Sequence, residues 1–569
     1  MDKKQLSAHE KELIRRIDRD HVNLKKEKDD MLPIYAELAR YLKPTRSGWG
    51  FEKDTTNEFG RYIFDGEAIS AKNKLSDGLF GYMVSPSINW LNISPRDQRA
   101  RDDQKVQAYC RQIVQHLMDT FARSNFYQTV SEAIDDGVVF GSEVVNVEED
   151  KKNKRPVYEA LHLREVMFSE NRAGEVDLLH REFEMTFRQL IEEFGENALD
   201  DGDLKSAKDN MEKRCRVIHA VYPRNFPGDT DNAVKIDIEK PYASVYLYCG
   251  ESIQGSDNQG ARYVLREGGF DFKRFVAWRY KKSSGMTYGG SPGMDALFDV
   301  KMLNMQSKTM ADVGQLAARP PMAAPMGMKG NLRIQPGGIS YYTGSDPRAV
   351  SPIMTTISYP FGIDTMERRS RIIRDHFKTD FFMAVSQNQA TSRDRTATEI
   401  MEMKAESAAV FGSSIGCLQS DLLSPLVMLT IEIESAAGRM PPIPEGVDPN
   451  IVTDIEFIGP LAQAQRKYLV KQGIEQGLQS AFNMAQANPD LMMNINLNSA
   501  MRRLMIVNGF PPEELYDPQQ VSKSQQQAAQ ARQEAQQEAM ALEKSKILAS
   551  SSKAPEDGSP LQAAMGGKK

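Results

Sequence analysis

The chain has 569 residues, of which 40% are hydrophobic and 26% charged, as is ordinary for a water-soluble protein. This length allows several hydrophobic cores, and the formal net charge of −6 at pH 7 argues against a general binder of polyanions. We expect no membrane span, because no apolar run approaches the required length, and residues 1–10 lack the apolar segment of a secretory signal.

Sequence motifs of enzymes and metal sites give no support for catalysis. There is no P-loop pattern GxxxxGK[ST] and no HExxH, and the four cysteines form no CxxC pair. Residues 412–416 match the GxSxG pattern of hydrolases, but a predicted helix surrounds them, so close helix packing or a kink is the simpler interpretation. We expect no catalytic residue, cofactor or metal, and we interpret Asp135–Asp136 as solvated or capping carboxylates.

The N-terminal half is predicted to contain helices followed by strands. Apolar residues at helical spacing predict helices over residues 7–43, 60–83, 102–123 and 125–139, with a short strand over 90–93. Alternating patterns then predict strands over residues 142–147, 157–163, 175–187, 217–222, 243–248 and 275–280, with a short helix over 187–194.

Two helices and an insert form the centre of the chain. A glycine-rich turn at residues 288–293 precedes a predicted helix over 294–316, which ends before Pro320 and Pro321 because proline cannot continue a helix. A second helix is predicted over residues 363–382. The insert between them contains a predicted hairpin, with strands over 331–335 and 339–343.

A polar stretch and a long helix follow. Residues 386–395 bear cations and no apolar anchor, which predicts a loop. Thr396 and Glu399 form a capping box that begins a helix, which we expect to continue to Ala437 over about 60 Å at 1.5 Å per residue. Beyond it the sequence predicts a strand over 451–458, helices over 461–487 and 496–508, and a Gln/Ala-rich segment over 519–548 that is either a packed helix or disordered.

This order of elements resembles the portal, or head-to-tail connector, proteins of short-tailed bacteriophages. The resemblance extends over most of residues 30–460, and the order of several short phrases carries it. These phrases lie at residues 61–65, 79–86, 181–186, 288–292, 318–321, 335–338, 396–400 and 423–426.

The resemblance implies an α+β, mostly helical portal fold with wing, stem, clip and crown, assembled as a ring around a central channel. The implied parts are a wing (1–288), stem helix 1 (289–317), a clip (318–359), stem helix 2 (360–383), a tunnel loop (384–396), a long wing helix with its strand (397–460), crown helices (461–518) and a C-terminal helix and tail (519–569).

The same resemblance implies roles for three sets of residues. The tunnel loop would contact DNA phosphates weakly and without sequence preference, and its residues are Gln387, Asn388, Gln389, Arg393 and Arg395. The stem would contribute charges to the channel, although its arginines could instead pair with Asp295 and Asp299 or with a neighbouring subunit; these charges are Lys301, Lys308, Arg368, Arg371, Arg374 and Lys378. The clip would dock the packaging motor or the tail adaptor through Leu332, Ile334, Tyr341 and Tyr342.

The implied function is that of a portal ring at one capsid vertex, a homo-oligomer that the family predicts to be a dodecamer. The implied partners are double-stranded DNA, the terminase large subunit, the major capsid and scaffolding proteins and a tail adaptor, with no membrane. The protein would be made in the host bacterial cytoplasm and end in the virion. A structural scaffold or tail-tube protein without DNA passage is the alternative, followed by an enzyme.

Overall fold

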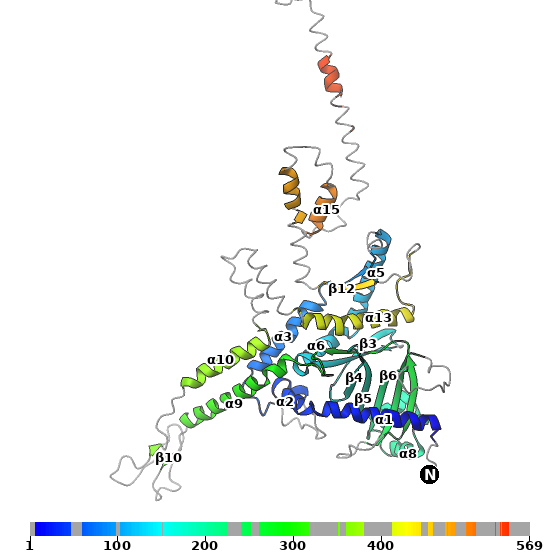
Figure 1. Ribbon diagram of the computed structural model, residues 1–569, viewed down its shortest axis with the longest axis vertical. Coiled ribbons are helices and arrows are strands. Elements are labelled where there is room, and N and C mark those ends of the chain that lie inside the picture. Colours follow the sequence, from blue (N-terminus) through cyan, green and yellow to red (C-terminus); the bar gives the residue numbers. More distant parts are fainter. Residues whose placement is uncertain are drawn as a thin grey trace, which may run out of the picture. The chain divides into compact units, whose positions relative to one another are not determined.

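The computed structural model divides the chain into two compact units, Met1–Leu461 and Ala462–Lys569 (Figure 1). The described residues are 6–46, 60–97, 103–150, 152–224, 240–251, 261–318, 322–323, 351–352, 360–379, 412, 414–444, 453–458, 473–474, 476–483, 497–507, 530, 535 and 537–544.

The N-terminal helices differ from the prediction at two places. The helix expected over residues 7–43 is two helices, α1 (Ala8–Asp29) and α2 (Leu32–Leu42), because Pro33 in the first turn of α2 cannot continue α1. The helix expected over 60–83 is α3 (Glu67–Met83), and residues 60–66 precede it as a turn. The next two predictions are confirmed as α5 (Gln104–Arg123) and α6 (Phe126–Phe140).

A five-stranded antiparallel sheet has the order β4-β5-β6-β7-β8. Three of its strands match predicted ones, whereas β4 and β8, together with the helix α8 (Asp201–Asp209), were not predicted. The strands are β4 (Val166–Glu170), β5 (Val176–Thr186), β6 (Arg214–Pro223), β7 (Tyr242–Glu251) and β8 (Tyr263–Phe270).

Side chains alternate between the two faces of this sheet, and helices pack on both faces. On β6, Ile218 and Ala220 face the apolar side of α1, whereas Cys215 and Val217 face a cluster that includes α7 (Phe187–Phe194) and α8. The period of two therefore places one helix on the first face and two helices on the second.

Smaller sheets connect distant segments of the same unit. β2 (Ser142–Asp150) lies between β3 (Arg155–Leu161) and β9 (Phe275–Arg279), and β1 (Leu91–Pro95) pairs with β12 (Thr453–Phe457). In the central insert, β10 (Met322–Ala323) pairs antiparallel with β11 (Ser351–Pro352), which brings the two ends of the insert together. The predicted hairpin over 331–343 lies outside the described residues.

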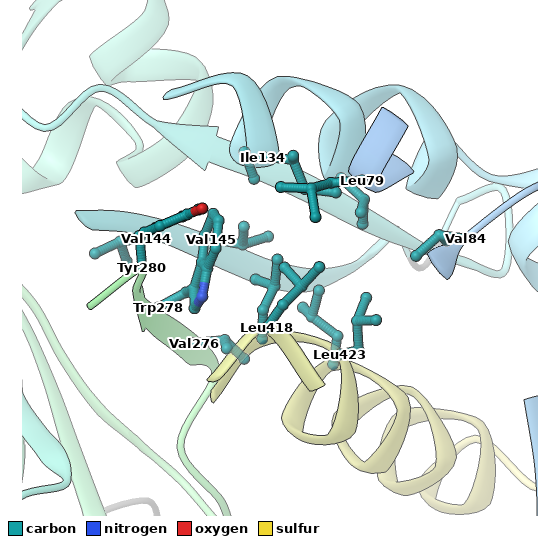
Figure 2. Packing of buried hydrophobic residues seen from close by; sticks show 14 of the residues in the cluster. Leu79, Val84, Ile134, Val144, Val145, Val276, Trp278, Tyr280, Leu418 and Leu423 are labelled. Carbon is teal, nitrogen blue, oxygen red and sulfur yellow. The ribbon is translucent and has the colours of Figure 1, made fainter. Parts of the chain in front are cut away.

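The largest core joins helices and strands from the whole first unit. Trp90 stacks on Phe121 and Phe126 with ring centroids 5.7 and 5.9 Å apart. Figure 2 shows another part of this core, where Trp278 of β9 lies near Leu418 and Leu423. A methyl group at Gly137 of α6 would overlap the Trp278 ring, so a glycine is required where this helix crosses the strand.

The described part of the predicted long helix contains a π-helical segment, Leu418–Leu423, followed by α13 (Ser424–Ala436). The preceding residues 396–411 lie outside the described ones. The helix over residues 414–436 is long and apolar enough to cross a membrane, contrary to our expectation. Leu418, Leu422 and Leu426 on this helix are buried among residues of the largest core.

The second unit is described over short segments. Helical backbone at 476–483 and α15 (Leu497–Val507) fall within the two helices predicted for residues 461–508. Within the Gln/Ala-rich segment, residues 537–544 are helical, and the large side chains Met540 and Leu542 are exposed.

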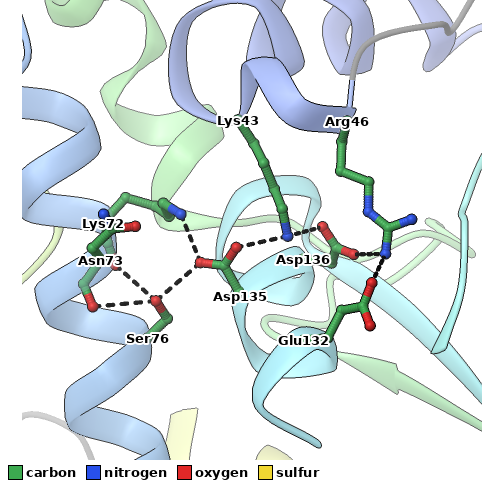
Figure 3. A network of polar contacts seen from close by, with 8 residues as sticks. All are labelled: Lys43, Arg46, Lys72, Asn73, Ser76, Glu132, Asp135 and Asp136. Atoms are coloured by element: carbon green, nitrogen blue, oxygen red, sulfur yellow. Dashed lines mark hydrogen bonds and ion pairs between the residues drawn. The ribbon is translucent and has the colours of Figure 1, made fainter. Parts of the chain in front are cut away.

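A buried network of charges corrects our interpretation of Asp135 and Asp136. Lys43 Nζ lies 2.6 Å from Asp135 and 2.6 Å from Asp136, and Lys72 Nζ lies 2.7 Å from Asp135 (Figure 3). Arg46 pairs with Asp136 at 2.9 Å. Burial alone would raise the pKa of Asp135, but the two lysines outweigh it and lower that pKa. These carboxylates therefore link α2, α3 and α6 and are neither solvated nor capping.

Glu143 of β2 lies beside this network without taking part in it. Its side chain is buried, and neither carboxylate oxygen has a hydrogen-bond partner among the described residues. Burial, followed by the nearby Asp136 carboxylate, raises the pKa of Glu143 well above 4.5. The folded protein therefore holds this side chain protonated at pH values where the unfolded chain would release the proton.

We predict that Glu143→Gln stabilises the protein at neutral pH. A raised folded-state pKa destabilises the fold once the pH exceeds the unfolded value of 4.5, and the amide removes this penalty. We expect the melting temperature at pH 7.5 to rise by roughly 2–4 °C, and the difference to vanish below pH 4. Glu148→Gln, on an exposed residue of the same strand, is the control. An equal rise in melting temperature at all pH values would contradict a raised pKa of Glu143.

Candidate functional site

The most distinctive feature of the first unit is a pair of helices, α9 (Pro292–Ala318) and α10 (Pro360–His376), that run side by side (Figure 1). Both correspond to predicted helices, although α10 ends six residues before the predicted Phe382. The α9–α10 pair frames the insert whose ends meet at β10 and β11.

A close contact of main chains fixes the start of α9. The Gly289 N–H donates to Ser142 Oγ at 2.8 Å, and Ser291 Oγ donates to the Val139 carbonyl at 2.7 Å. Ser291 Oγ also accepts from the Met294 N–H at 3.0 Å, which caps the helix. A Cβ atom at Gly293 would lie 2.8 Å from the Val139 carbonyl oxygen, so only glycine allows this approach.

Two polar side chains of α9 bind the turn that precedes α3. Asn304 Nδ2 donates to the Tyr62 carbonyl at 2.6 Å, and Asn304 Oδ1 accepts from the Phe64 N–H at 2.7 Å. Ser307 Oγ donates to Asp65 Oδ2 at 3.0 Å. These bonds explain why residues 60–66 form a turn on α9 instead of extending α3.

An ion pair and apolar side chains join the two helices of the pair. Arg369 Nη1 lies 2.7 Å from Asp299 Oδ1, and Ile373 and Phe377 are buried in the largest core. Among the described residues, none of Arg368, Arg371 and Arg374 pairs with Asp295 or Asp299, and the alternative that they pair with a neighbouring subunit stays a prediction. Arg369 follows Met366 by three residues and precedes Ile373 by four, so all three lie on one side of α10. That side faces α9.

The six predicted stem charges fall into two groups. Lys301 and Arg374 are used within the subunit, because Lys301 pairs with Glu37 at 2.7 Å and Arg374 with Glu67 at 3.5 Å. The others are exposed and have no ion-pair partner within the part of the chain that the structure describes. They are Lys308, which lies over the Phe64 ring at 5.4 Å, and Arg368, Arg371 and Lys378.

The exposed side of α10 carries both signs of charge. Arg368 and Arg371 share it with Asp364 and Asp375, since these positions are three or four residues apart. Alternating signs give a weak net field, so such a face can touch a polyanion without holding it tightly. The structure thus provides an exposed surface of mixed charge, and among its described residues no group of three or more His, Cys, Asp or Glu could hold a metal ion.

Comparison with known proteins identifies the family. The sequence profile described as "Bacteriophage head to tail connecting protein" matches residues 15–516. The chain belongs to this family. It is 28% identical over 457 residues to the probable portal protein of Bordetella phage BPP-1, with 78% of each chain covered. It is 27% identical over 508 residues to the portal protein of Salmonella phage epsilon15, with 88% of each chain covered.

Membership confirms the resemblance given by the sequence phrases, and the protein is a connector between the head and the tail of a phage. Two sets of its predicted site residues lie outside the described residues. They are the tunnel-loop set Gln387, Asn388, Gln389, Arg393 and Arg395, and the clip set Leu332, Ile334, Tyr341 and Tyr342.

Sequence reasoning missed two residues of the connector that organise the helix pair. Asn304 looked like any polar position of α9, because its partners are main-chain atoms about 240 residues away in the sequence. Arg369 stands among similar arginines, and only its phase relative to Met366 and Ile373 could have distinguished it.

We predict opposite effects of alanine at two glycines of α9. Gly293→Ala should lower the free energy of unfolding by about 1–3 kcal/mol, because the added methyl overlaps the Val139 carbonyl. Gly314→Ala, on the same helix with no atom within 4 Å of the added methyl, should raise it by about 0.5–1 kcal/mol. Urea titration monitored by tryptophan fluorescence measures both. Equal effects at the two positions would show that the close contact is not required.

Proposed function

We propose that the chain is the subunit of a portal ring at one vertex of the phage capsid. In this proposal the ring nucleates head assembly, docks the terminase motor, passes double-stranded DNA during packaging and ejection, and joins the head to the tail. The observation that carries it is the family match over residues 15–516, and the names of the two relatives support it. Twelve subunits is the proposed size, and the role is structural and not enzymatic.

The parts of the subunit follow from this function. The α9–α10 pair forms the stem, and the insert between β10 and β11 forms the clip, which docks the terminase large subunit or the tail adaptor. Residues 384–396 form the tunnel loop, and the remainder of the first unit forms the wing. Residues 461–518 form the crown helices, and residues 519–569 form the C-terminal helix, a possible barrel, and the tail. The major capsid and scaffolding proteins contact the wing, and assembly takes place in the host bacterial cytoplasm.

The exposed charges of α10 support a channel that lets DNA slide. Arg368 and Arg371 of α10, and Lys378 just beyond its end, can contact phosphates and make no base contacts. Phosphate contacts carry no sequence information. Asp364 and Asp375 on the same side limit the attraction, so that DNA is not retained. This balance fits a passage better than a storage site.

Negative-stain electron microscopy of the purified protein tests the proposal directly. We expect closed rings with a central hole, whereas a scaffold or tail-tube protein would give no such ring, or stacked tubes. Native mass spectrometry of the same sample counts the subunits. A protein that remains monomeric at every concentration, under conditions where it is folded, would contradict the portal assignment.

We predict that the tunnel loop is needed for packaging and dispensable for ring formation. The loop contains no apolar anchor, so deleting residues 387–393 should leave the rings unchanged in micrographs. The deletion should lower the fraction of DNA-filled heads, because phosphate contacts from Arg393 and its neighbours are lost. Replacing Arg393 and Arg395 with lysine, which keeps the charge, is the matched control. Loss of rings on deletion would contradict this prediction.

A further inference from the structure

One side of α9 bears large apolar side chains that the described part of the chain leaves uncovered. Phe298 is 67% exposed and Met305 56% exposed. They are seven residues apart, which places them on one stripe of the helix. Phe64, 46% exposed, lies beside this stripe under Lys308. Exposed apolar side chains that gather in one place mark a surface where another protein binds.

A groove opens on a different side of the same helix. Its cavity volume is about 370 Å³, within the range of pockets that bury ligand-sized groups. Met310 of α9 and Met366 of α10 line it, and methionine walls adapt to the shape of an inserted side chain. Glu67 of α3 and Glu367 and Arg374 of α10 also line it and supply charge.

The stripe and the groove cannot meet within one subunit. Met310 follows Phe298 by twelve residues, so at 100° per residue it lies about 120° further around α9. One helix therefore presents a protruding apolar surface and a receiving groove in different directions. Two unlike, complementary surfaces on one chain are what a head-to-tail contact requires, and such contacts form a ring when the rotation between subunits closes.

We propose that Phe298 and Met305 of one subunit insert into the Met310–Met366 groove of the next subunit. The charges agree with this contact. Lys308 lies three residues from Met305 on the border of the stripe, and Glu367 lines the groove without an ion-pair partner among the described residues. An ion pair between Lys308 of one subunit and Glu367 of the next would fix the register. This contact rests on the proposed ring and names the residues that build it.

Charge substitution in the stripe tests the contact. Phe298→Asp with Met305→Asp should abolish rings in micrographs and leave monomers with an unchanged circular dichroism spectrum, because both positions are exposed within the subunit. Met211→Asp, at an exposed apolar residue of the wing, is the control and should form rings like the unchanged protein. Rings formed as usual by the double variant would overturn the contact. If the unchanged protein forms no rings, the proposed function fails, and this contact fails with it.

Cross-linking between subunits provides a second test of the contact. Protein with Phe298→Cys is mixed with protein bearing Met366→Cys, both carrying Cys417→Ser, and the mixture is assembled and oxidised. Disulfides form only where Cα atoms come within about 7 Å, so a covalent dimer in the mixture, and in neither protein alone, supports the contact. Rings without this dimer would overturn it and would mean that a tail or capsid protein covers the stripe and the groove.

Discussion

The structure depends on one contact of main chains, where the turn before α9 lies against the junction of α6 and β2. Two serine hydroxyls, Ser142 and Ser291, satisfy main-chain groups of the opposite segment there. Gly141 has a φ of 81°, and a methyl group on it would overlap the Gly289 carbonyl. Because the backbones touch without intervening side chains, the direction in which α9 leaves the body has little freedom.

Buried ion pairs hold α2 and α3 against α6, the helix whose end makes this contact. Lys43 bridges Asp135 and Asp136, so the end of α2 is tied to α6 (Figure 3). Removing one partner of such a network leaves an uncompensated charge in the interior, which costs several kcal/mol. This network and the stacked rings around Trp90 both stabilise the body from which α9 extends.

The elements that could be predicted from the sequence are those whose pattern is local. The apolar spacing in α9 and the alternation along β6 follow from which face is buried, and both were predicted. The turn at residues 60–66 was mistaken for helix, because its main chain is bound by Asn304, which is distant in the sequence. Asp135 was interpreted as solvated or capping because no local pattern indicates the two lysines, Lys43 and Lys72, that reach it from other parts of the chain.

The candidate site was predictable only where its pattern is local. The helix pair and its basic residues are visible in the sequence, but whether an arginine faces its neighbour or solvent depends on helix phase. A difference of one residue moves a side chain by 100°, which separates Arg368 from the paired Arg369. Phe298 lies outside the apolar set that predicts α9, and the sequence pattern gave no expectation for its exposure.

We propose that the α9–α10 pair is the stem of a ring-shaped connector. A cryo-electron microscopy reconstruction of the assembled ring at side-chain resolution tests it most directly. We expect α9–α10 pairs to surround the central hole, with the charged side of α10 toward water or DNA and Phe298 covered by the next subunit. A ring in which these pairs point outward, away from the hole, with Phe298 exposed to solvent, would contradict it.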